Sequence, residues 1–392
     1  MLKTVFTMKN LLHKVCAYVL LCALLCCVPV CAQGLSEFHR GDLAAKLRVV
    51  KAASQRGDAA VAFAALDFST ATADTLKGDK QFLELTEAAV KSLTAGNCLG
   101  REKEASDKLC RIFVLFDQRS IKAAVIDGFS VFFSSESLRL VNDFFYSRMQ
   151  NPGEMDEALL KATLFLGTYG NSASFNMLFI ADILGVWPSY NSILADAYGN
   201  LAEGSEKEIL QLLATVPVSK KIRILTRLDE NPKIPKKICG EAAENALSQV
   251  IYTSGSKDLT ADQLELALLA LKLVSQTSWT RASAPVGSCF SVLKAQYEAG
   301  RVSEEDFSEA IREIASISSP ETAKELSSYL DQLNRQTEKS SAPSEAVVLS
   351  VIDSLGGLGD KTAFDSLLYT TYLDYPEEVL SAARTALANL KW

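Results

Sequence analysis

Histidine is almost absent from this chain of 392 residues, which contains only His13 and His39. A metal site built from several histidines is therefore excluded, and a Ser-His-Asp or Cys-His catalytic group is disfavoured. The chain also has no C-x-x-C pair, which argues against a zinc or redox site of that kind. We expect His39 to be a solvated residue, and we predict no metal and no cofactor.

Sequence motifs of enzymes are also missing. There is no G-x-S-x-G, no H-E-x-x-H and no calcium-loop spacing of acids, and the glycine-rich residues 356–362 lack the G-K-[ST] ending of a phosphate loop. The S-x-x-K pattern of penicillin-binding proteins occurs at residues 254–257 and 291–294, but K-T-G is absent. Neighbouring acids at 229–230 and 304–306 lie at predicted helix ends, where acids cap and solvate. We therefore predict no catalytic residue and a protein that is not an enzyme.

The first 32 residues have the parts of a cleavable secretory signal. Three lysines and no acid precede an apolar run at residues 15–28, and Pro29 and Ala32 follow it. A basic start, a short apolar stretch and a small residue before the cut are typical of such signals. We expect cleavage after Ala32 and a periplasmic or secreted protein, with Met8 as a candidate start.

Two alternatives for this segment stay open. One is attachment of lipid at Cys26, Cys27 or Cys31, although the residues before these cysteines fit a lipidation site poorly. The other is an uncleaved anchor, for which the apolar run is short against the roughly 20 residues that a spanning helix needs. No later apolar run approaches that length, so we expect no membrane span after cleavage.

Cleavage would leave an acidic protein. Loss of Lys3, Lys9 and Lys14 lowers the Lys plus Arg count from 40 to 37 against 47 Asp plus Glu, which gives a net charge of −10. Nucleic-acid binding depends on cations that neutralise phosphates, so we predict no nucleic-acid partner. Passive adhesion to anionic lipid is disfavoured for the same reason.

Five of the nine cysteines lie in the signal, and the remaining four are Cys98, Cys110, Cys239 and Cys289. In an oxidising compartment they allow three pairings, among them Cys98–Cys110 with Cys239–Cys289. Four buried free thiols are the alternative, because free cysteine behaves as a small apolar residue. The sequence leaves both open.

The rest of the chain has the pattern of helices. Apolar residues recur at helical spacing, as in Leu326, Leu330 and Leu333, while no period of two indicates a strand. Helix starts are expected at Ser319-Pro320, at Thr260 with Gln263, at Ser303 with Asp306 and at Pro376; a helix end is expected at Gly356-Gly357. We predict about sixteen to eighteen helices and essentially no sheet.

The sequence also repeats itself. Residues 166–178 match residues 355–367 at a constant separation of 189, with Leu, Gly, Gly, Phe and Leu in common, and Ala197 matches Ala386 at the same separation. Gly57-Asp58 is a weaker relative. Helix, Gly-Asp or Gly-Asn turn and helix resembles the HEAT family of helical repeats, which run about 40–47 residues.

This resemblance implies an all-α solenoid of stacked helical hairpins. Its expected parts are a signal peptide at 1–32, a solenoid at 36–335 and a C-terminal helical repeat at 343–392 that continues the solenoid. Breaks are expected at 231–235 and 335–344. The resemblance implies a surface for binding a protein and carries no catalytic residue across.

Two surface features are candidates for that binding. A basic segment and two aromatic residues at a repeat turn make up the set Lys220, Lys221, Arg223, Arg227, Lys233, Lys236, Lys237, Trp187 and Tyr190. A solvated face and simple packing are the alternatives. The aromatic cluster 129–146 is expected to be core.

These observations predict an exported scaffold or protein-binding module whose partner is another protein of the cell envelope. The alternatives are a cell-wall glycan hydrolase that uses paired carboxylates across a cleft, and a purely structural envelope component.

Overall fold

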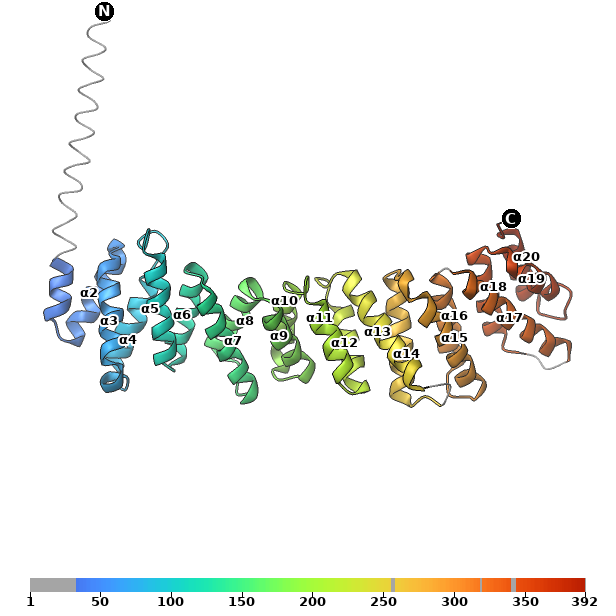
Figure 1. Ribbon diagram of the computed structural model, residues 1–392, viewed down its shortest axis with the longest axis horizontal. Coiled ribbons are helices and arrows are strands. Elements are labelled where there is room, and N and C mark those ends of the chain that lie inside the picture. The colour runs from blue at the N-terminus through green and yellow to red at the C-terminus, as the bar shows by residue number, and fades with distance from the viewer. Residues whose placement is uncertain (1–32, 255–257, 318, 340–342, 392) are drawn as a thin grey trace, which may run out of the picture. The chain divides into compact units, whose positions relative to one another are not determined.

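The structure is a computed structural model that describes residues 33–254, 258–317, 319–339 and 343–391. The predicted signal segment 1–32, with its candidate lipidation cysteines, lies outside these residues. The chain divides into two compact units, Met1–Ala197 and Tyr198–Trp392, and the division falls within helix α10. Both units are made of helices (Figure 1).

Unit 1 begins with a helical stretch at 33–40. Its further helices are α2 (Leu43–Arg56), α3 (Ala59–Leu76), α4 (Lys80–Lys91), α5 (Glu102–Leu115), α6 (Arg119–Val131), α7 (Ser135–Gln150), α8 (Glu157–Tyr169), α9 (Ser172–Leu184), the 3-10 helix η1 (Pro188–Tyr190) and most of α10 (Asn191–Gly199).

Unit 2 continues with helices of similar length. They are α11 (Glu206–Thr215), α12 (Val218–Glu230), α13 (Lys236–Ser254), α14 (Ala261–Gln276), η2 (Thr280–Ala282), α15 (Ser283–Glu298), α16 (Glu304–Ser316), α17 (Pro320–Glu338), α18 (Glu345–Leu358), η3 (Lys361–Ala363), α19 (Phe364–Thr370) and α20 (Glu377–Ala388).

The helices of each unit form two layers. In unit 1, α2, α4, α6 and α8 contact one another in succession, and so do α3, α5, α7 and α9. In unit 2 the same holds for the even helices α12 to α20 and the odd helices α11 to α19. Helices that follow each other in the chain pack across the layers. The fold is therefore an all-α helical-repeat solenoid, as predicted.

Burial follows the predicted apolar stripes. Leu326, Leu330 and Leu333 are buried in α17, and α18 is buried along Val348, Ile352 and Leu355. Apolar residues at this spacing share one face of a helix. Each helix buries this face against the apolar faces of the neighbouring helices. The core of each unit therefore runs between its two layers.

Most predicted helix starts are confirmed. Ser319 caps α17 by accepting a hydrogen bond from the N–H of Thr322, and Thr260 forms a reciprocal capping box with Gln263 at α14. Ser303 caps α16, but Asp306 accepts a hydrogen bond from the Ser303 hydroxyl and does not return to the backbone. Glu377 opens α20 directly after Pro376.

Three sequence predictions about elements are wrong. Gly356-Gly357 does not end a helix, because α18 continues to Leu358 and is capped by Gly359 in the left-handed region, at φ 65°. The loop expected from 335 begins only after Glu338, because α17 extends through that residue. The described residues hold nineteen α-helices, α2 to α20, besides 33–40, which exceeds the predicted number.

The internal repeat reappears as a structural contact. A Cβ atom added to Gly167 in α8 would lie 2.7 Å from the Cα atom of Ala197 in α10. A Cβ atom added to Gly356 in α18 would lie 3.0 Å from the Cα atom of Ala386 in α20. The two pairs are the ones that matched at a separation of 189 in the sequence. In both units a glycine thus lets two helices of the even layer approach closely.

A buried lysine recurs in unit 1 and was not predicted. The Nζ atom of Lys46 in α2 donates hydrogen bonds to the carbonyl oxygens of Phe38 (2.6 Å) and Gly41 (2.7 Å), and it lies 5.2 Å from the ring centre of Phe68. At the C-terminal end of a helix, an ammonium group can donate hydrogen bonds to carbonyl oxygens that have no partner within the helix. The face of a nearby aromatic ring stabilises its charge further.

The same arrangement occurs in the next pair of hairpins. The Nζ atom of Lys122 in α6 donates to the carbonyl oxygen of Phe113 (2.7 Å) and lies 5.6 Å from the ring centre of Phe144. Burial lowers the pKa of Lys122. Lys122 follows Lys46 by 76 residues, and Phe144 follows Phe68 by the same separation. Unit 1 therefore contains a second internal repeat, two hairpins long.

The neighbouring glycines of α18 provide a test of the close contact. We expect Gly356→Ala to destabilise the protein by about 1–3 kcal/mol, because the added methyl group meets the backbone of α20. Gly357→Ala should instead stabilise it by about 0.5–1 kcal/mol, because no atom lies within 4 Å and alanine favours the helix. Thermal and urea unfolding of both variants measure the difference. Equal effects of the two substitutions would contradict the close-contact explanation.

Candidate functional site

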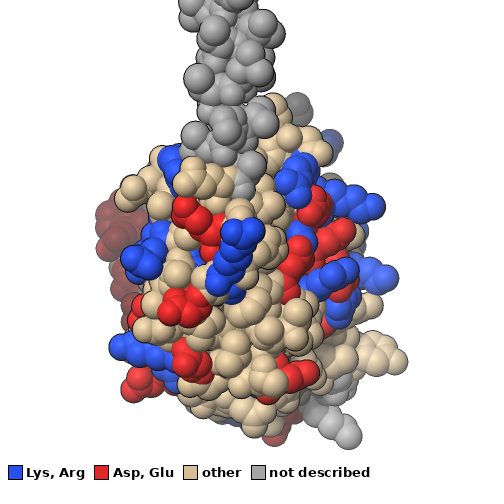
Figure 2. Space-filling view, turned by 90° about the vertical axis from the view of Figure 1, so that its left-hand side faces the viewer, with Lys and Arg blue, Asp and Glu red and all other residues tan. Residues whose placement is uncertain are grey.

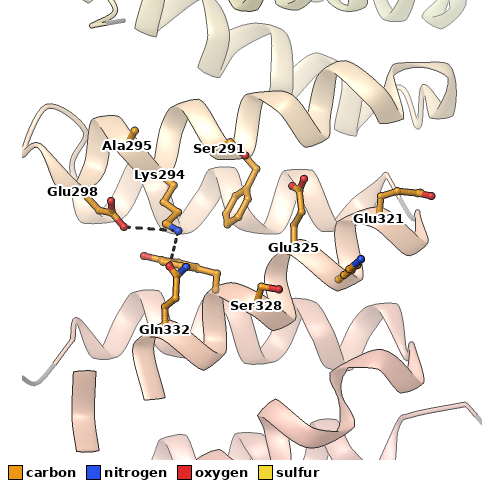
Figure 3. Close-up of a pocket in the computed structure, with 11 residues that line it drawn as sticks. Ser291, Lys294, Ala295, Glu298, Glu321, Glu325, Ser328 and Gln332 are labelled. Carbon is orange, nitrogen blue, oxygen red and sulfur yellow. Dashed lines mark hydrogen bonds and ion pairs between the residues drawn. The ribbon is translucent and has the colours of Figure 1, made fainter. Parts of the chain in front are cut away.

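A groove of about 580 Å³ opens between α15 and α17 in the odd layer of unit 2 (Figure 3). Phe290 and Tyr329 are buried beside it, with their ring centres 5.7 Å apart. The Nζ atom of Lys294 donates to the side-chain oxygen of Gln332 (2.6 Å), lies 4.0 Å from a carboxylate oxygen of Glu298 and lies 5.0 Å from the ring centre of Tyr329. The groove thus combines an apolar floor with fixed charges.

A carboxylate lies at the other end of this groove. Burial raises the pKa of Glu325. Its carboxylate lies against Gly287 of α15, where an added Cβ would be 3.9 Å from an Oε atom. Figure 3 shows Glu325 and Glu321 away from Lys294, which points toward Gln332 and Glu298. The acids and the lysine are therefore distributed along the groove.

The S-x-x-K pattern at 291–294 falls in this groove, but its geometry does not suit a nucleophile. Ser291 and Lys294 both line the groove. Figure 3 shows the ammonium group of Lys294 directed to Gln332 and Glu298, away from Ser291. A base that activates serine has to lie within hydrogen-bond reach of its hydroxyl. Of the second S-x-x-K pattern, Lys257 lies outside the described residues.

A second groove, of about 320 Å³, lies in the even layer of unit 2 across α12, α14 and α16. Ile222, Leu268 and Leu269 contribute apolar surface, and four acids and one lysine line the remainder: Glu265, Asp306, Glu309, Glu313 and Lys272. Burial, reinforced by Glu309, raises the pKa of Glu313 to about 7, and Lys272 opposes the shift. Glu313 therefore changes charge near neutral pH.

A third groove, of about 570 Å³, lies at the start of unit 1 between residues 33–40 and α2. Its uncharged lining residues are Ser36, Gly41, Ala45, Val49 and Ala52. Its charged lining residues are Arg40, Arg48, Arg56 and Glu37. These arginines were not predicted from the sequence, in which the spacing of Arg48 and Arg56 along one helix was the available signal.

The predicted basic segment is spread over α12, the following loop and the start of α13. Several of its cations have partners within the protein. Lys221 donates to the side chain of Gln249, Arg227 pairs with Glu230 at 2.7 Å, and Lys233 donates to the side chain of Asn200 at 2.8 Å. Lys237 lies 4.0 Å from Glu206. Hydrogen bonds and ion pairs within the protein thus engage several of the cations of this segment, and its role in binding stays a prediction.

The two predicted aromatic residues differ in their surroundings. Trp187 is buried, its indole N–H donates to the carbonyl oxygen of Gly153 (2.9 Å), and its ring meets Phe145 edge-on. This burial withdraws the ring from any partner, so the packing alternative applies to Trp187. Tyr190 is partly exposed in η1. Both belong to unit 1, whereas the basic segment belongs to unit 2.

The aromatic cluster expected to be core is only partly buried. Phe129, Phe132 and Phe145 are buried, but Phe133 is 48% exposed and Tyr146 is 52% exposed. Phe133 follows the end of α6, where its ring stacks on Tyr169 of α8 at 5.3 Å. Density of aromatic residues in the sequence does not reveal which of them lie on the outer side of a helix.

All four described cysteines carry free thiols, so neither of the bridges that the sequence left open is formed. Burial raises the pKa of Cys239 to about 11 and of Cys289 to about 12. Cys98 and Cys110 also have raised pKa values because of burial. Since the thiolate is the reactive form, these cysteines behave as packing residues.

Neighbouring acids lie at helix ends, as expected. Asp229 and Glu230 end α12, while Glu304, Glu305 and Asp306 form the first turn of α16. His39 is exposed at the surface of unit 1. The described residues contain no group of three or more His, Cys, Asp or Glu side chains arranged to hold a metal ion.

Among the described residues, we find no helix that is both long enough and apolar enough to cross a membrane.

Comparison with known proteins adds little to this description. No protein-family model matches the chain, and no curated protein matches it. Among solved structures it is similar to a circular tandem repeat protein with a novel repeat topology, at 14% identity and a TM-score of 0.20, covering 88% of this chain and 75% of that one. A computationally designed self-assembling cyclic homooligomer is 13% identical, with a TM-score of 0.12 over 87% of this chain and 93% of that one.

The raised pKa of Glu313 predicts a dependence of stability on pH. Its folded pKa of about 7 exceeds its ordinary value of 4.5, so the folded state holds its proton more tightly and loses stability as pH rises between these values. We expect Glu313→Gln to raise the melting temperature clearly at about pH 8 and little at about pH 5.

Glu305→Gln is the matched control, because Glu305 is exposed on the same helix outside the groove. It should change the melting temperature equally little at both pH values. If Glu313→Gln changes the melting temperature as little as this control at both pH values, the pKa of Glu313 is not raised in the folded protein.

Proposed function

We propose that this protein is an exported, non-enzymatic scaffold that binds another protein of the cell envelope. The grooves of unit 2 carry this proposal. They lie between successive helices of one layer, and each offers apolar surface together with charged side chains. Such surfaces suit a protein segment, which presents apolar and polar side chains at once.

A HEAT-like character of the repeats is part of the proposal. It is supported by the repeated turns and by the repeated glycine contact. Asp58 and Asn171 cap the second helix of their hairpins, and Asp360 caps η3 at the corresponding turn. The hairpins around Gly167 and Gly356 also place alanine at the same position of a later helix.

Export is proposed from the character of residues 1–32. Cleavage after Ala32 would place a protein of net charge −10 in the periplasm or outside the cell. Lipid attachment at a cysteine of this segment is the alternative, and it would anchor the protein to the envelope.

Glycan hydrolysis is the alternative function, and one observation favours it. Glu325 has a pKa raised by burial and shares a groove with Glu298 and Glu321. A glycosidase needs one protonated and one ionised carboxyl group on either side of the scissile bond. Lys294 of the same groove lies 4.0 Å from Glu298 and donates to Gln332, and this mixture of cation, amide and acids suits a binding surface better than a pair of catalytic carboxylates, so protein binding is preferred.

Mild crosslinking of the envelope followed by purification tests the binding function. We expect a defined protein to be recovered with this chain and not with an unrelated exported protein that carries the same signal. Recovery of nothing above that control would favour the purely structural alternative. Release of soluble fragments from purified cell-wall glycan, abolished by Glu325→Gln, would establish the hydrolase instead.

Mass spectrometry of the mature N-terminus tests export. We expect a chain that begins at Gln33 without a lipid, because Ala32 is the small residue before the proposed cut. An acylated cysteine at the N-terminus would establish the lipid-anchored form. An intact segment 1–32 in the purified envelope protein would contradict cleavage altogether.

A further inference from the structure

The groove at the start of unit 1 concentrates positive charge in an acidic protein. Its lining contains three arginines and one acid, while the chain as a whole has seven more acids than bases. Figure 2 looks at this end and shows Lys and Arg side chains interspersed with Asp and Glu side chains over the surface. The groove is thus locally opposite in charge to the molecule.

The arginines of the groove have no acidic partner in the described chain. No ion pair joins Arg40, Arg48 or Arg56 to a carboxylate of the described residues. Among the nearby acids, Asp42 and Asp58 each accept a backbone N–H at a helix start, and Glu37 lines the groove. The Oδ2 atom of Asp58 and the Nη2 atom of Arg56 lie 4.0 Å and 3.9 Å from a Cβ atom added to Gly34, without forming an ion pair. The guanidinium groups are therefore available to an external anion.

The shape of the groove follows from its small residues. Gly41 closes the turn before α2, and an added Cβ there would lie 2.8 Å from the Cβ of Ala45. Ala45 and Ala52 leave space between the arginine side chains. Arg48 and Arg56 are eight residues apart on one helix, which corresponds to about 12 Å along its axis. The result is a shallow channel with cations at intervals.

We propose that this groove binds an acidic segment of a partner protein, in extended form, with its carboxylates on the arginines and small side chains on the alanines. An extended chain advances about 3.3 Å per residue, so carboxylates four residues apart match the separation of Arg48 and Arg56. Guanidinium groups bind carboxylates through paired hydrogen bonds, which gives this contact direction as well as charge. The inference goes beyond the proposed function, because it assigns a binding site to unit 1 and names the chemistry of its occupant.

Binding of a defined peptide tests the groove directly. The probe is a capped peptide of alternating glutamate and alanine, and its counterpart has glutamine in place of each glutamate. Fluorescence anisotropy should detect the glutamate peptide, weakening as salt rises from about 0.1 M to 1 M because the screening length falls from about 10 Å to 3 Å. The glutamine peptide should not bind.

Charge reversal locates the site. We expect Arg48→Glu with Arg56→Glu to weaken the glutamate peptide about tenfold or more, because two attractions become repulsions. Lys80→Glu with Lys103→Glu makes the same charge change at exposed residues outside the groove and should have little effect. The reversed variant should gain affinity for a peptide of alternating lysine and alanine, which a merely unfolded variant would not.

Several outcomes would overturn the proposal. Equal weakening by the control pair would mean a general charge effect. Arginine-dependent binding of inorganic pyrophosphate or of phosphatidylglycerol vesicles, without binding of the glutamate peptide, would assign the groove to phosphate. No binding of any probe would leave it as a solvated face. If crosslinking recovers the same partner from the reversed variant in equal yield, this inference fails while the proposed function stands.

Discussion

The close approach of helices in the even layer is the constraint on which the rest of the array depends. At Gly167 and Gly356 one helix backbone lies so near the next that a methyl group would meet the Cα atom of an alanine. Interiors are packed to the density of organic crystals, so such a contact fixes the separation of the two helices. At this fixed separation, the apolar faces of the two helices bury each other. The helices of the odd layer then have to pack over a spacing that the even layer has set. Larger openings are then expected between helices that carry longer side chains, as in the groove between α15 and α17.

Buried lysines solve a different problem at the ends of the hairpins in unit 1. A tight turn leaves the last carbonyl groups of a helix without partners and near the core, where an unpaired polar group is costly. Lys46 and Lys122 reach these carbonyls from the following helix and bring no acid into the interior. The face of a neighbouring aromatic ring stabilises each ammonium group by a cation–π interaction.

The sequence allowed the architecture to be predicted, because helix spacing, caps and a turn glycine are local properties. Thr260, Ser319 and the stripe of α17 were identified from a few neighbouring residues. The errors lie where the outcome depends on a distant contact. The sequence predicts a helix end at Gly356-Gly357, but Gly356 packs closely against α20 and lies within α18. Phe133 reads as core, yet the position of α8 leaves it on the surface beside Tyr169. Trp187 reads as a candidate contact residue, yet Gly153 accepts its N–H.

The surface was less predictable than the core for the same physical reason. A run of cations such as Lys220 to Lys237 is visible in sequence, but Glu230 of α12 and Glu206 of α11 pair with two of them. The side-chain amides of Gln249 and Asn200 accept hydrogen bonds from two others. The arginines of the first groove are scattered over seventeen positions of the chain, from Arg40 to Arg56, and become a cluster only when residues 33–40 fold back on α2. An interior hairpin has a preceding hairpin on that side, as α4 has α2. Among the described residues no hairpin packs on residues 33–40 and α2 from that side, and the side chains there carry charge. Solubility explains the polarity of such a face but not the sign of its charge, because it would be served as well by the acids that dominate the rest of the molecule. The choice of arginine at three lining positions therefore calls for a reason beyond solubility, and recognition of an anionic partner supplies one.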